Sequence, residues 1–198
     1  MFVIRMFDNV FDWLVDNSPK IRKTILGRYN IEGHWFDAVW SSGDGAVREF
    51  GLIRISFSER SFHVNGDLYS PQFNEIGSFY SKFAKIVENK LEYAYERQLC
   101  AGKFQQASGL GQYSFEVAST SGIPYSFMGK FFDPELDQQI HLRGIRIQDQ
   151  DDLSILDSPR SAADPDRGKK IREIVEKYAC SWLDQNPKAM HAKLEHQF

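Results

Sequence analysis

Short stretches of alternating apolar and polar residues recur about eight times between residues 31 and 147. Alternation with a period of two indicates β-strands that bury one face. The predicted strands cover residues 31–41, 47–57, 62–69, 78–87, 91–97, 112–118, 125–132 and 140–147. Most connections are of hairpin length, which favours antiparallel neighbours. The chain is therefore predicted to be mainly β, an eight-stranded antiparallel up-and-down barrel that leaves no free sheet edge.

Helical patterns flank these strands. Apolar side chains recur at helical spacing within residues 2–16, and again at Ile171, Ile174, Val175, Tyr178 and Trp182. These patterns predict an N-terminal helix and a C-terminal amphipathic helix. Residues 149–167 are polar and include an acidic cluster at Asp149, Asp151 and Asp152, which predicts a solvated connector.

The expected organisation is thus an N-terminal helical segment (1–28), a barrel domain (29–148), an acidic connector (149–167) and a C-terminal helix with a tail (168–198). A length of 198 residues suits one domain. The net charge is −3, and no basic stripe marks the chain as a binder of duplex nucleic acid. A homo-oligomer is compatible with these features.

The two cysteines lie far apart in the sequence, which favours two free thiols and a reducing, cytoplasmic location. No stretch reaches the ~20 apolar residues of a membrane-spanning helix. Any membrane association is expected to need a partner or a segment outside this chain.

Catalytic motifs are absent from the sequence. It holds no HExxH, P-loop or GxSxG pattern, and its five histidines lack the spacing of metal ligands. Gly109-Leu110-Gly111 lacks the third glycine of a dinucleotide fingerprint, so the segment from Gly102 to Gly111 is interpreted as a loop. We expect no enzyme, no cofactor and no metal, although folding can bring distant carboxyl groups together.

Strand parity predicts which side chains face the barrel interior. In the fifth strand Glu92, Ala94 and Glu96 share the outer face, which leaves the alternate residues inside. The predicted inward positions are Leu91, Tyr93, Tyr95 and Arg97 in the fifth strand, Tyr125, Phe127, Gly129 and Phe131 in the seventh, and Gly33, Trp35, Asp37, Val39 and Ser41 in the first.

Gly33-His34-Trp35 resembles the GxW motif that opens the first strand of lipocalins. In that family the tryptophan closes one end of the barrel and an arginine from a late strand packs across it. Arg146 stands in the matching place. The resemblance implies barrel closure by Gly33, Trp35 and Arg146, and an interior that carries an apolar small molecule.

A closer resemblance is to the β-barrel domain of bacterial anti-phage effectors of CBASS systems, which bind cyclic oligonucleotides. It rests on the segments Ile31-Glu32-Gly33-His34-Trp35, Gly51-Leu52-Ile53-Arg54-Ile55, Phe62-His63-Val64-Asn65-Gly66, Leu91-Glu92-Tyr93-Ala94-Tyr95 and Leu142-Arg143-Gly144-Ile145-Arg146-Ile147. Those effectors typically carry two transmembrane helices before the barrel, which this chain does not. The resemblance implies a sensor of a cyclic di- or trinucleotide in antiviral defence, without the membrane-disrupting part.

If Trp35 marks the closed end, the ligand site is expected at the other end. The candidate ligand-binding residues are Ser41, Arg48, Tyr93, Tyr95, Arg97, Tyr113 and Arg143. Tyrosine can stack on a base and arginine can hold a phosphate with two donors. Two alternatives stay open: the tyrosines simply fill the barrel and Arg97 is a rim charge, or the flanking helices make the protein a scaffold for a partner.

Overall fold

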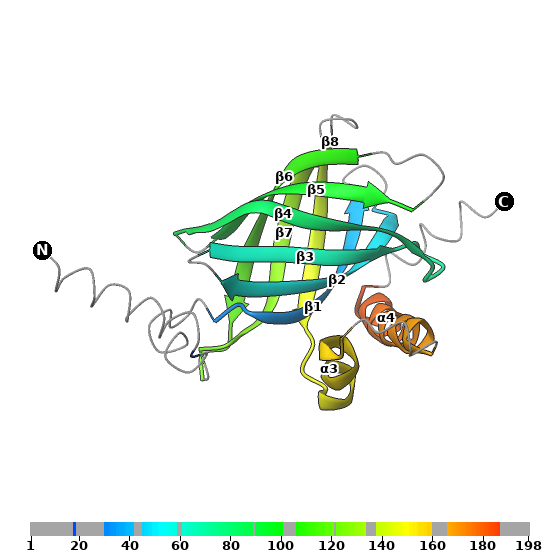
Figure 1. Ribbon diagram of the computed structural model, residues 1–198. Helices are drawn as coiled ribbons and strands as arrows, with labels where there is room; N and C mark the ends of the chain where they lie inside the picture. Colours follow the sequence, from blue (N-terminus) through cyan, green and yellow to red (C-terminus); the bar gives the residue numbers. More distant parts are fainter. Residues whose placement is uncertain are drawn as a thin grey trace, which may run out of the picture.

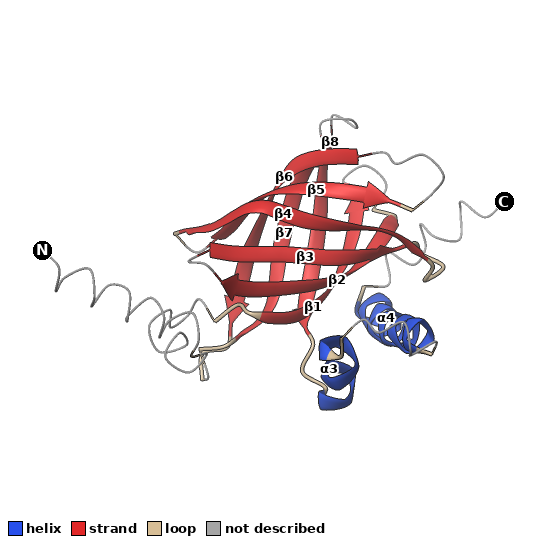
Figure 2. Ribbon diagram, in the orientation of Figure 1, coloured by secondary structure: helices blue, strands red, loops and turns tan. Residues whose placement is uncertain are grey.

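The computed structural model is a closed barrel whose eight strands pair antiparallel in sequence order, with β1 closing against β8 (Figures 1 and 2). The structure describes residues 18, 30–41, 45–58, 61–88, 90–100, 106–120, 122–133, 138–159 and 166–186. The strands are β1 (Gly33–Ser41), β2 (Val47–Ser58), β3 (Ser61–Tyr69), β4 (Glu75–Val87), β5 (Lys90–Leu99), β6 (Gln106–Val117), β7 (Pro124–Asp133) and β8 (Gln138–Arg146). The predicted mainly β, up-and-down barrel is confirmed.

Seven strands lie close to their predicted positions, and β6 begins earlier than expected. Gly109 and Gly111 belong to this strand, so the prediction of a loop up to Gly111 is wrong. Both glycines pair with tyrosines of β5, Gly109 with Tyr95 and Gly111 with Tyr93. A glycine inside a strand often marks a close approach of a neighbouring group, and here each glycine makes room for a tyrosine ring.

Aromatic side chains fill the half of the barrel that contains Trp35. The ring of Tyr113 stacks on Phe127 with 4.4 Å between centroids, and Phe127 lies 5.4 Å from the Trp35 ring. All three side chains are fully buried. The parity prediction holds for Phe127 and Phe131, but Tyr125 is 48% exposed, since it lies next to a bulge in the β6–β7 pairing.

The helix α4 (Arg167–Gln185) lies against the outer face of the barrel at β1 and β2 (Figure 1). The outward side chains Phe36 and Phe50 are therefore buried, and Tyr178 of α4 stacks on Phe36 with 5.9 Å between the rings. The amphipathic helix predicted at the C-terminal end is confirmed. The helix predicted over residues 2–16 lies outside the described residues.

Another helix, α3 (Gln150–Asp157), occupies part of the predicted connector. Asp149 caps it by accepting the backbone N–H groups of Asp151 and Asp152. Asp152 is buried, and Lys177 of α4 pairs with Asp149 at 2.9 Å and with Asp152 at 2.8 Å. The prediction of a solvated connector is wrong here, because these acidic side chains start a helix and fasten it to α4. Neither described helix is long and apolar enough to cross a membrane.

Candidate functional site

One end of the barrel is sealed around Trp35. The Arg146 guanidinium lies over the indole, 5.4 Å from its centroid, and donates hydrogen bonds to the backbone carbonyls of Asn30, Glu32 and Pro124. Gly33 has a φ of +135°, and a Cβ added to it would lie 3.2 Å from the arginine. The three residues expected to close the barrel thus lie together at this end.

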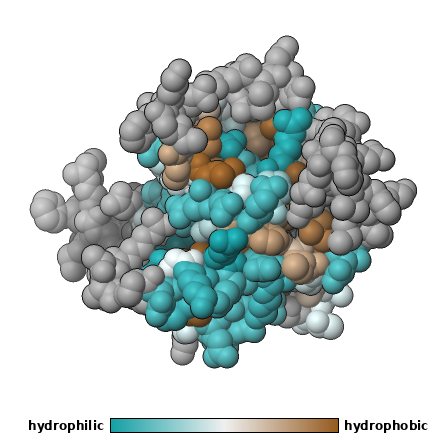
Figure 3. All heavy atoms as spheres, turned by 90° about the vertical axis from the view of Figure 1, so that its right-hand side faces the viewer, coloured by the Kyte–Doolittle hydropathy of each residue, from teal (hydrophilic) through white to brown (hydrophobic). Residues whose placement is uncertain are grey.

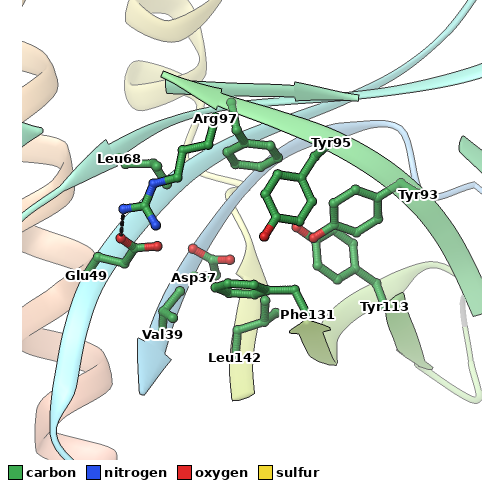
Figure 4. A pocket seen from close by; sticks show the side chains of 11 residues that line it. Asp37, Val39, Glu49, Leu68, Tyr93, Tyr95, Arg97, Tyr113, Phe131 and Leu142 are labelled. Atoms are coloured by element: carbon green, nitrogen blue, oxygen red, sulfur yellow. Dashed lines mark hydrogen bonds and ion pairs between the residues drawn. The ribbon is translucent and has the colours of Figure 1, made fainter. Parts of the chain in front are cut away.

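A small cavity lies inside the barrel beyond this aromatic layer (Figure 4). The space open to water-sized molecules is about 30 Å³, which is room for one or two waters. Its walls combine apolar and aromatic side chains with a few polar ones. The lining residues are Asp37, Val39, Glu49, Leu68, Phe79, Tyr93, Tyr95, Arg97, Tyr113, Phe131 and Leu142.

Asp37 is the most unusual group of the cavity. It lies opposite Gly51 in the β1–β2 pairing, and the missing side chain of Gly51 leaves the space that its carboxyl group occupies. Burial, and second the negative charge of Glu49, raise the pKa of Asp37 to about 8. Its Oδ1 atom has no hydrogen-bond partner among the described residues. Near neutral pH this carboxyl group is thus largely protonated.

An ion pair crosses the cavity from β5 to β2. Arg97 Nη2 lies 2.5 Å from Glu49 Oε2, and both side chains are mostly buried. The Nε atom of Arg97 has no hydrogen-bond partner among the described residues. Glu49 faces inward with Gly51 and Ile53, a parity that follows from the alternation along β2. Sequence reasoning missed Glu49 because it placed the neighbouring Arg48 at the site.

The tyrosines supply neutral hydroxyl groups. The ring centroids of Tyr93 and Tyr113 lie 4.8 Å apart, and the two hydroxyl groups are hydrogen-bonded to each other. Burial raises the pKa of both hydroxyl groups. The Tyr95 hydroxyl points toward Asp37 (Figure 4). Phe79 and Phe131 contact the Tyr95 ring edge-on, with centroids 6.2 Å and 5.9 Å away. One side of the cavity is thus an aromatic wall beside a carboxyl group.

The structure brings together four of the seven residues predicted to bind ligand: Tyr93, Tyr95, Arg97 and Tyr113. Arg48 and Arg143 are exposed on the outside of the barrel, so their placement at the site is wrong. Arg143 alternates with the inward Leu142 and Gly144, and Arg48 stands at a bulge where Trp40 pairs with Val47. Ser41 ends β1, and its side chain lies outside the described part of the chain.

The end of the barrel opposite Trp35 shows hydrophobic surface between hydrophilic residues (Figure 3). Within the described residues, no group of three or more His, Cys, Asp or Glu side chains could hold a metal ion. No protein-family model matches the chain, and no curated protein matches it either.

Proposed function

We propose that this barrel is a non-enzymatic binding module that holds the polar end of one small ligand beside Asp37. The observation that carries the proposal is the buried Asp37 Oδ1 atom, which has no hydrogen-bond partner among the described residues. A buried polar atom left unsatisfied costs about 1–3 kcal/mol. A ligand that donates a hydrogen bond to Asp37 removes this cost, and the apolar walls bind the rest of the molecule.

The size of the cavity favours a small ligand over a cyclic oligonucleotide. Pockets for drug-sized molecules measure about 300–1,000 Å³, whereas this one offers about 30 Å³. The charge of Arg97 is engaged by Glu49, and Arg48 and Arg143 lie outside. The cyclic-nucleotide sensor rests on the sequence resemblance and stands as the second candidate, with Arg97 as the observation in its favour.

The scaffold alternative loses the support of the C-terminal helix. It requires Ile171 and Trp182 to be exposed in the isolated chain, and both are buried against the barrel. By contrast, the apolar lining of the cavity, from Val39, Leu68 and Leu142, favours a carrier of a small molecule with an apolar part.

A thermal-shift screen tests the proposal. The purified chain is scanned with small amines, alcohols and carboxylic acids, with fatty acids, and with cyclic di- and trinucleotides, because a ligand specific to the folded state raises Tm. We expect a small compound to raise Tm in the wild type and in the exterior variant Arg143→Gln, and to lose this effect in Asp37→Asn.

Two outcomes contradict the proposal. If no small compound shifts Tm, or if the shift survives Asp37→Asn, the cavity is not the binding site. A shift caused by a cyclic nucleotide and lost in Arg97→Ala instead supports the sensor.

A further inference from the structure

The cavity holds more acidic than basic groups, so its charges are unbalanced once Asp37 is ionised. Asp37 and Glu49 bring two acidic groups, and Arg97 brings one basic group. The groups that line the cavity around Asp37 are Glu49 from β2, Tyr93, Tyr95 and Arg97 from β5, and Tyr113 from β6. The tyrosines are neutral, and the Arg97 guanidinium is held by Glu49 at 2.5 Å. With Asp37 ionised, the cavity therefore carries one uncompensated negative charge.

From this imbalance we infer that the ligand is a small organic cation, whose ammonium group lies between the Asp37 carboxylate and the surrounding aromatic rings. The inference rests on the proposed function and names the chemical class of its ligand. An ammonium group donates up to three hydrogen bonds and accepts none, which matches the unpartnered Oδ1 acceptor. An anion would instead face two acidic side chains.

The aromatic wall favours the same class. The rings of Tyr95 and Phe131 lie near Asp37 (Figure 4), and Phe79 also lines the cavity. A cation within about 6 Å of an aromatic ring centroid is attracted by the negative face of the ring. An ammonium head is also close in size to the one or two waters for which the cavity has room.

Binding of an ammonium group has a consequence for the Asp37 proton. Before a ligand binds, Asp37 is largely protonated at neutral pH, since burial raises its pKa to about 8. The ligand enters as a cation, the carboxyl O–H bond breaks, and one proton passes to solvent as the ion pair forms. Affinity is therefore coupled to pH, and a pKa of about 8 makes binding about tenfold tighter at pH 9 than at pH 7.

The experiment titrates the full chain with methylammonium, methanol and formate, three probes of different charge that are small enough for a cavity with room for one or two waters. Binding is followed by NMR through the Asp37 carboxyl carbon and the backbone amide of Gly51, which lies opposite Asp37 in the β1–β2 pairing. We expect methylammonium to bind at least about tenfold more tightly than methanol at pH 9, since a hydrogen bond to a charged group is worth about 1.5–3 kcal/mol. Saturation of the site with the ammonium probe is expected to lower the pKa of Asp37.

Variants that remove one acidic group at a time test the contributions of Asp37 and Glu49 separately. Asp37→Asn should abolish both the preference for the cation and the pH dependence, and Glu49→Gln should weaken the binding of methylammonium and strengthen the binding of formate. Arg48→Gln, which changes a neighbouring residue on the outside, should leave all three affinities unchanged. The comparison of wild-type affinities at pH 7 and pH 9 needs no variant, so the inference can be tested even if a variant does not fold.

The outcomes distinguish the two proposals. Equal affinity for methylammonium and methanol at pH 9, tighter binding of formate, or binding of the cation that does not change with pH overturns the cation inference and leaves a ligand-binding cavity. If none of the three probes shifts the Asp37 or Gly51 signals, and the Tm screen finds no ligand that depends on Asp37, both proposals fail together.

Discussion

Gly111 lies directly opposite Tyr93 in the β5–β6 pairing, so close to the tyrosine ring that a methyl group on this glycine would overlap it. The same relationship recurs around the barrel. Four further glycines whose added Cβ would meet a directly opposite aromatic ring are Gly109 with Tyr95, Gly66 with Phe79, Gly129 with Tyr113 and Gly144 with Phe127. These glycines let large rings enter a narrow barrel, which is why the interior is nearly filled.

Replacing such a glycine should destabilise the fold. We expect Gly111→Ala to lower the free energy of unfolding by about 1–3 kcal/mol, because the added methyl group forces the buried Tyr93 ring to move. Urea denaturation measures the change. Gly168 in α4 is the matched control, since a Cβ there has open space around it and Ala should stabilise the helix by about 0.5–1 kcal/mol. Equal effects of both substitutions would contradict the packing argument.

Stability should fall with pH through Asp37. Its pKa is raised from 3.8 to about 8 in the folded protein, so the folded state binds this proton more tightly than the unfolded chain. The resulting stabilisation is fully present below about pH 4 and is lost as the pH rises to about 8. Over this range the free energy of unfolding falls by up to ~1.4 kcal/mol per pH unit. Asp37→Asn should remove this slope.

Urea denaturation between pH 5 and pH 8 measures that slope. The exposed variant Asp184→Asn is the control and should leave the slope unchanged. A wild-type slope that persists in Asp37→Asn would assign the pH dependence to other groups.

The Arg97–Glu49 pair should be strongly coupled. Removing the guanidinium with Arg97→Met leaves the Glu49 charge in a mostly buried place, and we expect a loss of about 2–4 kcal/mol in the free energy of unfolding. The double variant with Glu49→Leu should be closer to the wild type than Arg97→Met alone. A double-mutant cycle by urea denaturation gives the coupling energy, expected at about 1–3 kcal/mol. Additive effects would show that the pair contributes nothing.

The closed end should depend on the planar guanidinium of Arg146. Three backbone carbonyls accept hydrogen bonds from it, so Arg146→Met should lower the free energy of unfolding by at least about 2 kcal/mol. Arg146→Lys should not restore it, because one ammonium group cannot reproduce the fork of donors. Arg143→Met, on the outside of the same strand, should change stability by less than about 0.5 kcal/mol. Thermal and urea unfolding of the three variants check this order.

Local pattern was sufficient for much of this fold. Alternation along the strands predicted the barrel, its antiparallel order and the inward faces of β1 and β5, because a period of two leaves one face buried whatever the rest of the chain does. It also placed Tyr93, Tyr95 and Arg97 on one inward face. The short helix α3 was not predicted, because its eight residues are mostly polar and the main sequence sign of it is the cap at Asp149.

The site depended on contacts across the barrel. Asp37 and Glu49 come from neighbouring strands, and Arg97 meets them from β5, 48 residues further along the chain than Glu49. No local sequence pattern predicts that Arg97 and Glu49 meet in space, that the pKa of an enclosed carboxyl group is raised, or that a bulge leaves Arg48 on the outside. The sequence by itself determined the strands and the direction of their side chains, since these follow from backbone geometry. Tertiary structure alone decided which charges meet and how little space remains between the rings, because burial and electrostatics depend on every wall of the cavity at once.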